Sequence, residues 1–201
     1  MSTEPDKDIQ AEGNQAAKAK PKKDAKKEMI SWILTIVTAV AAALLIRTFL
    51  FEPIRVDGES MTDTLNDTEL VFVTKPEYYL GTPQRQDVII CKYPDRKNQY
   101  FVKRLIALPG DTVQIKYDVL SRTNTLYVNG EAVSEPYLTP TRNDSNNSYG
   151  PATLGEDEYF VMGDNRDNSN DSRYVGPLHR SQIVGHVRFV FFPFSSIRAV
   201  K

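Results

Sequence analysis

One serine and one lysine of this sequence stand in settings that could support nucleophilic catalysis. Ser60 lies in the segment DGESM, where Gly58 permits a tight backbone turn. Lys103 lies in YFVKRLIALPGD, which is apolar from 100 to 102 and from 105 to 109. A lysine in such a strand-like run is usually a surface residue whose amine reaches water. The alternative is an amine removed from water, which is the condition under which lysine acts as a base for a serine.

The amine of Lys103 could serve as a base only if the protein lowered its pKa strongly. A free lysine titrates near 10.4, whereas an efficient general base titrates near 7. A shift of roughly three units corresponds to about 4 to 5 kcal/mol, at about 1.36 kcal/mol per unit. The rest of the domain must therefore fix the amine in place. It must also offer neutral hydrogen-bond acceptors, because a carboxylate directly against the amine raises the pKa again.

Other kinds of chemistry find little support in the sequence. Cys91 is the only cysteine, which excludes an internal disulfide framework and a zinc site built on several cysteines. His179 and His186 are seven residues apart with no cysteine beside them, so we expect structural histidines and neither a metal nor a cofactor. The formal net charge is −1 and no basic patch carries interleaved aromatics, which argues against nucleic-acid binding.

A further segment concentrates many polar side chains in a short span. The sequence GDNRDNSNDSR at 163–173 contains three aspartates, three asparagines, two arginines and two serines. The strand-like run YFVM precedes it at 159–162. Taken alone, such a segment indicates a solvated loop. Its interpretation therefore depends on the elements around it.

The N-terminal part of the chain predicts a membrane anchor. Residues 1–28 are polar, rich in lysine and free of aromatic side chains, which predicts a disordered tail. The segment MISWILTIVTAVAAALLI at 29–46 has no charge and would span roughly 27 Å as a helix, close to the hydrocarbon thickness of a bilayer. A buried core helix would show a polar face, and a cleaved signal peptide would have a shorter apolar core followed by a small-x-small site. We therefore predict an uncleaved transmembrane helix at 29–51.

The remaining residues, 52–201, predict one mostly β domain outside the cytoplasm. The lysines lie on the N-terminal side of the anchor, so the positive-inside rule places the N-terminus in the cytoplasm. Short runs rich in Val, Ile, Tyr and Phe are bounded by Gly, Pro, Asn and Asp. Asn129-Gly130 between two such runs predicts a type I′ hairpin turn. The run VRFVFFPF at 187–194 is either a central strand or a surface that rests on the bilayer, and both can hold.

Four stretches resemble a known family. They are VDGESMTDTL, QRQDVIICKYP, YFVKRLIALPGD and GDNRDNSNDSRYVG, and they follow an anchor in this order. The chain resembles the bacterial type I signal peptidases in their single-anchor form. These are membrane-anchored Ser-Lys proteases that remove signal peptides from exported proteins. The resemblance implies an all-β catalytic domain of two antiparallel sheets behind one transmembrane helix.

The resemblance also implies roles for individual residues. Ser60 is the nucleophile, and Lys103 is the general base that takes its proton. Ser169 supplies the neutral hydroxyl that hydrogen-bonds the lysine amine. Asp171 and Arg173 form a structural pair that holds this region against the catalytic strands. Within 163–173, the positions Asn165, Arg166 and Asp167 receive no individual role beyond forming turns.

The environment of Ser60 is less fully defined by the resemblance. The backbone N–H of Ser60 would contribute to the oxyanion hole. Some relatives place a serine hydroxyl at the position of Gly58, so here any second donor must be a backbone N–H. Many relatives have proline where this chain has Asp63, which removes a fixed φ angle after the nucleophile. The candidate substrate-pocket residues are Val56, Met61 and Val102, and for the two valines an ordinary place in the core is an equal alternative.

The implied reaction is acyl transfer. An extended substrate would bind along strand edges, and small pockets would select the Ala-x-Ala pattern of signal-peptide cleavage sites. The expected partners are preproteins that carry signal peptides, together with membrane lipid. Two rivals remain: a membrane-tethered β module that binds without catalysis, and a self-cleaving Ser-Lys protease of the LexA-repressor kind. The second would be cytoplasmic and carry a DNA-binding helix-turn-helix, whereas this chain begins with a lysine-rich tail and an anchor.

Overall fold

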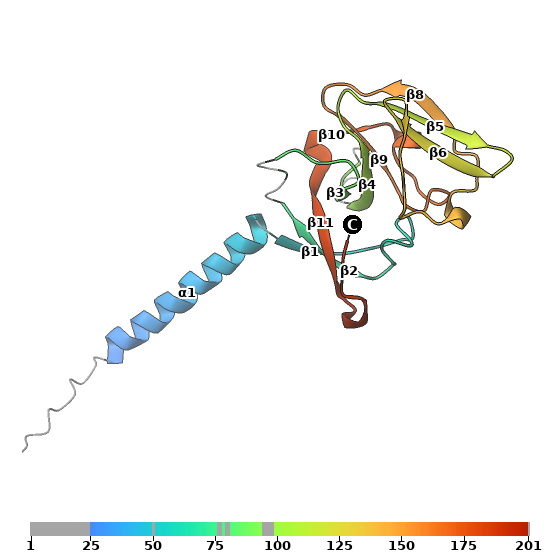
Figure 1. Cartoon of the computed structure of the whole chain (residues 1–201). Coiled ribbons are helices and arrows are strands. Elements are labelled where there is room, and N and C mark those ends of the chain that lie inside the picture. The colour runs from blue at the N-terminus through green and yellow to red at the C-terminus, as the bar shows by residue number, and fades with distance from the viewer. Residues whose placement is uncertain (1–24, 50, 76–77, 79–80, 94–98, 201) are drawn as a thin grey trace, which may run out of the picture. The chain divides into compact units, whose positions relative to one another are not determined.

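The computed structural model describes residues 25–49, 51–75, 78, 81–93 and 99–200 (Figure 1). The expected disordered tail lies outside the described residues as far as residue 24. Helix α1 (Ala25–Phe49) begins four residues before the expected anchor. Alanine and lysine are good helix formers, which explains why the helix extends back through Lys26 and Lys27.

Helix α1 is long and apolar enough to cross a membrane over Ala25–Leu45. The 21 residues of this span correspond to about 31 Å at a rise of about 1.5 Å per residue. Its hydroxyls do not create a polar face, because Thr35 donates to the Ser31 carbonyl and Thr38 to the Leu34 carbonyl. Such internal bonds satisfy a hydroxyl without water. The helix therefore suits the expected anchor.

The remaining described residues form two antiparallel sheets, which confirms the expected fold class. The order of the large sheet is β1-β2-β11-β3-β4-β9-β10, and β12 pairs with β11. Its strands are β1 (Phe51–Arg55), β2 (Leu70–Thr74), β3 (Val88–Cys91), β4 (Phe101–Ala107), β9 (Glu158–Met162), β10 (Leu178–His179), β11 (Ile183–Phe192) and β12 (Arg198–Ala199). Strand β11 lies between β2 and β3, and β4 lies beside β9, so segments distant along the chain meet at the centre of this sheet.

The small sheet has the order β7-β6-β5-β8. Its strands are β5 (Thr112–Asp118), β6 (Thr123–Val128), β7 (Glu131–Ala132) and β8 (Tyr149–Thr153). Figure 1 shows β5, β6 and β8 grouped to one side of the strands of the large sheet. Asn129 and Gly130 both have positive φ angles, 55° and 84°, and join β6 to β7. The expected hairpin is thus confirmed.

Apolar side chains explain why the central strands lie where they do. All four residues of β3 and all but the first of β4 are buried. A strand covered on both faces carries a nearly continuous apolar run. One cluster of buried side chains joins the two sheets. It includes Ile106 and Phe160 from the large sheet and Val113 and Leu126 from the small one. Strand β4 is therefore a rigid, fully enclosed support.

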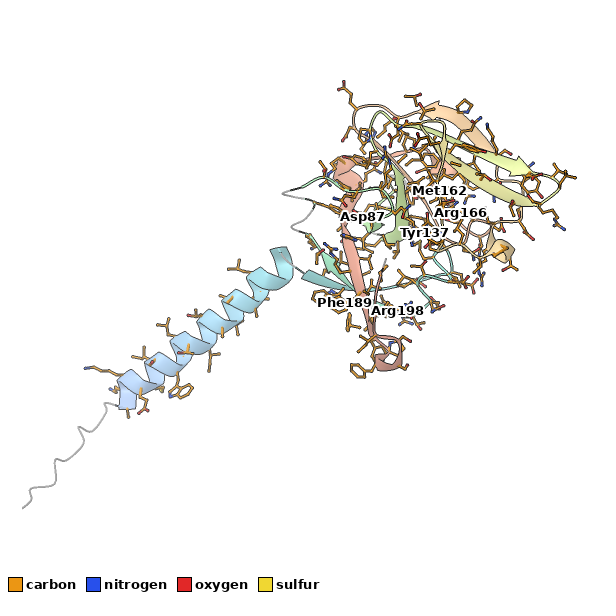
Figure 2. The ribbon with its side chains drawn as sticks, viewed as in Figure 1. Asp87, Tyr137, Met162, Arg166, Phe189 and Arg198 are labelled. Carbon is orange, nitrogen blue, oxygen red and sulfur yellow. The ribbon has the colours of Figure 1, made fainter. Side chains whose placement is uncertain are left out.

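The C-terminal apolar run contains the expected central strand and also exposed aromatic side chains, while its contact with a bilayer stays a prediction. Strand β11 is central, between β2 and β3, and its Val187 and Val190 are fully buried. Phe189, Phe192 and Phe194 remain exposed to 38, 44 and 77 %. Figure 2 shows the labelled Phe189 on β11. One part of the run therefore builds the core, while the rest forms an exposed aromatic surface.

Candidate active site

The two residues expected to do the chemistry meet in the structure. Ser60 lies in a turn after β1, where Gly58 adopts a positive φ of 98°, and Lys103 lies near the middle of β4. Lys103 Nζ donates a hydrogen bond of 2.7 Å to Ser60 Oγ. Lys103 itself is only 2 % exposed. A serine hydroxyl in contact with a buried amine is the arrangement that a Ser-Lys dyad requires.

The surroundings of Lys103 lower the pKa of its amine. The main cause is burial, which disfavours the charged form. The negative charges of Asp171 and Asp164 act in the opposite direction. Each of these carboxylates is bound by an arginine of its own, which limits this effect. Burial raises the pKa of the nearby Cys91 thiol to about 12, so that this group stays neutral near pH 7. The amine therefore lies in a site that favours its neutral form.

Asp164 and Arg104 form a fully buried ion pair beside the dyad. Arg104 Nε and Nη2 donate to the two oxygens of Asp164 at 2.9 and 2.7 Å. Thr64 Oγ1 donates to the same carboxylate, and Arg104 Nη1 donates to the Gln86 carbonyl at 2.8 Å. The pair therefore links the strand of Lys103 to the turn that carries Ser60. No role for Arg104 or Asp164 was predicted from the sequence. The available signal was an arginine inside an apolar strand, which demands a buried partner.

The next residues of the polar segment hold the backbone around Ser60. Asn165 N donates to the Ser60 carbonyl at 3.0 Å, and Asn165 Nδ2 donates to the Glu59 carbonyl at 3.2 Å. Asp167 Oδ2 accepts from Asp144 N, and its Oδ1 accepts from Asn147 Nδ2, both at 3.0 Å. The segment therefore holds the backbone of Glu59 and Ser60 through hydrogen bonds from Asn165. Residues 163–166 are buried, so the interpretation as a solvated loop is wrong for them.

Arg166 is nearly fully buried and bridges two parts of the domain. Its Nε donates to the Gly163 carbonyl at 3.0 Å. Its two terminal nitrogens bind the Glu135 carboxylate, with Nη1 to Oε2 at 3.0 Å. Glu135 follows β7, so this pair connects the small sheet to the polar segment. Figure 2 shows Arg166 near Tyr137, which belongs to the same loop as Glu135.

Asp171 and Arg173 form the expected structural pair. Arg173 Nε and Nη2 each donate to the carboxylate at 2.8 Å, and both side chains are buried. Asp171 Oδ2 also accepts from Gly163 N at 3.0 Å. Burial alone raises the pKa of Asp171, but the hydrogen bonds and charge of Arg173 outweigh it, so the pKa lies below its usual value. Asp171 also begins the short helix α3 (Ser172–Val175), where its side chain accepts from Arg173 N.

Ser169 does not make the hydrogen bond expected of it. Its Oγ is buried and contributes to the lowered pKa of Asp171, yet nothing in the described part of the chain meets it with regular hydrogen-bond geometry. Ser169 nevertheless lies beside the dyad. A Cβ atom at Gly163 would be 2.3 Å from Ser169 Oγ and 2.4 Å from the Ser60 carbonyl oxygen. The position of Ser169 thus agrees with the expectation, whereas its bond to Lys103 Nζ is absent.

The remaining expected site residues have more ordinary surroundings. Gly58 N donates to Asp67 Oδ1 at 2.9 Å, so this amide is already engaged and is not a second oxyanion donor in this structure. Val56, Met61 and Val102 all belong to one core cluster and are at most 9 % exposed. Their burial favours the core alternative. Their role in a substrate pocket stays a prediction.

Asp63, at the position where the family resemblance implies a proline, contacts the loop that follows β7. Its Oδ2 accepts from Thr139 Oγ1 at 2.9 Å, and Oδ1 lies 3.6 Å from Arg142 Nε. Both side chains of this ion pair are partly exposed. The loop after the nucleophile is therefore held by polar contacts instead of a proline ring.

A serine hydroxyl beside a buried amine, in a domain of two antiparallel sheets, is an arrangement that suits a serine endopeptidase. The model of the family described as signal peptidase, peptidase S26, matches residues 29–192. The chain belongs to this family. A non-catalytic β binding module is accordingly not favoured.

Two Bacillus relatives support the same conclusion. A signal peptidase I of Bacillus licheniformis is 47 % identical over 181 residues, covering 86 % of this chain and 94 % of that protein. Signal peptidase I T of Bacillus subtilis is 46 % identical over 180 residues, covering 86 and 90 %. The crystal structure of a signal peptidase I from Enterococcus faecalis is 38 % identical, with a TM-score of 0.43, and covers 52 % of this chain and 96 % of that one.

Proposed function

We propose that this protein removes signal peptides from exported preproteins by cutting after small-x-small sites, with Ser60 as nucleophile and Lys103 as general base. The observation that carries the proposal is the 2.7 Å contact between the buried Lys103 amine and the Ser60 hydroxyl. The family and the named relatives supply the substrate class. No cofactor has a role in this chemistry.

The proposed reaction proceeds in two acyl-transfer steps. Neutral Lys103 Nζ takes the proton of Ser60 Oγ while Oγ bonds to the scissile carbonyl carbon. The amine then gives this proton to the leaving nitrogen, which releases the mature protein and leaves the signal peptide esterified to Ser60. A water molecule loses a proton to Lys103 Nζ and attacks the ester, and the proton returns to Ser60 Oγ. Ser60 N–H is the proposed donor to the negatively charged carbonyl oxygen in both steps.

The proposed substrate lies extended along a strand edge near Ser60. Main-chain hydrogen bonds would hold it, and Val56, Met61 and Val102 are the proposed floor of the pockets for small side chains. Asp171 and Arg173 are proposed to keep the polar segment in place during this reaction.

The proposed topology follows from the charges that flank the helix. The lysine-rich residues 1–28 would lie in the cytoplasm, 29–51 would span the membrane, and 52–201 would lie outside. Exposed Phe192, Phe194 and Ile197 offer an apolar surface suited to membrane lipid. Such placement would bring the catalytic domain to the site where signal peptides reside.

The proposal is tested with the full chain in detergent and an exported preprotein as substrate. Wild type, Ser60→Ala and Lys103→Ala are incubated with it, and the new N-terminus is sequenced. We expect cleavage after a small-x-small site by wild type, and at least about a thousandfold slower cleavage by either variant, because loss of a dyad member removes the nucleophile or its base. Equal processing by all three proteins would rule out the Ser-Lys assignment.

A further inference from the structure

A loop of the small sheet reaches the catalytic segments with several of its polar side chains. Residues 134–142, here named the clamp loop, follow β7 and end with the short helix η1 (Pro140–Arg142). Glu135, Tyr137 and Thr139 point to the side of Ser60 and Lys103, since each contacts a segment that carries or adjoins them. The peptidase chemistry described above does not use this loop.

The strongest contact of the clamp loop is a buried ion pair. The side chains of Glu135 and Arg166 are 7 and 2 % exposed, and both carboxylate oxygens bind the guanidinium. Removing one partner of such a pair leaves an uncompensated charge inside the protein. Arg166 in turn donates to the Gly163 carbonyl at 3.0 Å. The Gly163 carbonyl is therefore linked through Arg166 to a residue of the clamp loop.

Tyr137 reinforces this contact and adds a second one. Its hydroxyl donates to Glu135 Oε1 at 2.7 Å, and the Arg104 guanidinium carbon lies 3.8 Å from the centre of its ring. Burial, followed by the charge of Glu135, raises the pKa of Tyr137, so the hydroxyl keeps its proton and remains a donor. Two neighbouring residues of one loop thus contact both buried arginines, one beside Lys103 and one within the polar segment.

Beyond the pair with Arg166, the clamp loop borders a groove and makes a partly exposed polar contact at its far end. On its other side, a groove of about 260 Å³ separates the loop from β6, bordered by Leu126, Val133 and Leu138 among others. At the far end, Thr139 and Arg142 contact Asp63, three residues after Ser60. The buried pair with Arg166 is therefore the main link between the loop and the site.

We propose that Glu135 is a positioning residue for the peptidase reaction, acting through Arg166 to hold Gly163 against the backbone of Ser60. The inference rests on the proposed function for its reaction. The Cα of Gly163 packs so closely on the Ser60 carbonyl that no side chain fits between them, and Asn165 N binds the same carbonyl. If Arg166 loses its counter-charge, its guanidinium turns towards water and releases the Gly163 carbonyl. The turn then moves away from Ser60, and the hydroxyl loses its alignment with Lys103.

The test compares four variants of the full chain in detergent. Glu135→Gln removes the charge, Glu135→Asp keeps it on a shorter side chain, and Tyr137→Phe removes only the hydrogen bond to Glu135. Glu131→Gln is the matched control, because Glu131 is an exposed glutamate of the same hairpin. Steady-state cleavage of a preprotein gives kcat and KM, and thermal melts confirm that each variant is folded at the assay temperature.

We expect Glu135→Gln to lower kcat by about 10- to 100-fold with KM nearly unchanged, because small displacements of reacting groups have effects of this size. Tyr137→Phe should give a smaller loss in the same direction, Glu135→Asp should recover part of the activity, and Glu131→Gln should match wild type. The burst of p-nitrophenol from p-nitrophenyl acetate reports the reactivity of Ser60 without a signal peptide. It should fall in the same order.

Several outcomes would overturn the inference. Wild-type kcat in folded Glu135→Gln, a loss confined to KM, or an equal loss in Glu131→Gln would each show that Glu135 does not position the dyad. If Glu135→Gln does not fold, Tyr137→Phe decides the question: an unchanged kcat contradicts the proposal. If wild type shows the p-nitrophenol burst but does not cut the preprotein, the proposed substrate is wrong. The inference about Glu135 is then tested by the burst alone, and an unchanged burst in Glu135→Gln contradicts it.

Discussion

At the scale of single residues, the proposed peptidase reaction depends on whether the Lys103 amine is charged. Lys103 is enclosed by strand β4 and its neighbours, and burial lowers the pKa of its amine below the 10.5 of a free lysine. A group that must lose its charge in order to be buried lowers the stability of the folded state. The burial of Lys103 therefore lowers the free energy of unfolding, and the same burial favours the neutral amine that the proposed reaction needs. Stability and activity should respond in opposite directions when this residue is replaced.

The variant Lys103→Met tests this cost, since methionine fills a similar volume without a charge. Below the folded pKa, both states of the wild type hold the proton and the cost is fully present. Between the folded pKa and 10.5, the unfolded chain binds more protons, so wild-type stability rises with pH. We expect Lys103→Met to be inactive and more stable at pH 7, with a melting temperature higher by about 2 to 4 °C per kcal/mol recovered. Its stability should lack the rise with pH. A melting temperature of Lys103→Met below that of wild type at pH 7 would contradict the claim that burying Lys103 destabilises the protein.

At the scale of elements, the segment 163–173 and strand β4 are joined by a buried ion pair. Arg104 on β4 and Asp164 in the segment are both fully enclosed, whereas Asp157 and His179 form a pair that is about 60 % exposed on each side. An exposed pair contributes about 0 to 1 kcal/mol, while breaking a buried one costs about 3 to 5 kcal/mol. The two pairs therefore permit a matched comparison.

We expect Asp164→Asn to lower the free energy of unfolding by about 3 to 5 kcal/mol, because it leaves the charge of Arg104 buried without compensation. Asp157→Asn should change it by less than about 1 kcal/mol. Urea unfolding of the full chain in detergent, followed by far-UV circular dichroism, measures both. Similar values for the two variants would show that the Arg104–Asp164 pair does not connect these elements strongly.

The sequence predicted the two catalytic candidates better than it predicted the frame around them. Ser60 and Lys103 stand in distinctive local settings, so their pairing followed from the apolar run and the family resemblance. The partner of Arg104 depends on the register of β4 with β9, which places Arg104 opposite Met162, two residues before Asp164. Such a register is set by the packing of both sheets and has no local signal. The ion pair between Glu135 and Arg166 also has no local signal, because the two residues are 31 positions apart in the sequence.

At the scale of the whole molecule, the fold buries the amine of Lys103 and places the hydroxyl of Ser60 against it. The large sheet supplies Lys103 from β4, and the turn after β1 supplies Ser60. The small sheet contributes the contacts of its loop to Arg166, and the C-terminal strand β12 contributes Arg198, which binds Glu69 and the Thr64 carbonyl. Figure 2 shows Arg198 and Arg166 in separate regions of the domain. Contacts from distant parts of the chain thus converge on the segments around Ser60.

The central claim is that this enclosure lowers the pKa of Lys103 so that its neutral amine acts as the base for Ser60, so the most direct measurement is the pH dependence of acylation. Single-turnover cleavage of a preprotein by the full chain in detergent gives the rate of attack by Ser60 at each pH. Because burial lowers the pKa of Lys103, the rate should rise through an apparent pKa well below 10.5 and reach a plateau. A rate that still climbs at pH 10 would contradict the claim, since it would show a lysine that titrates as it does in water.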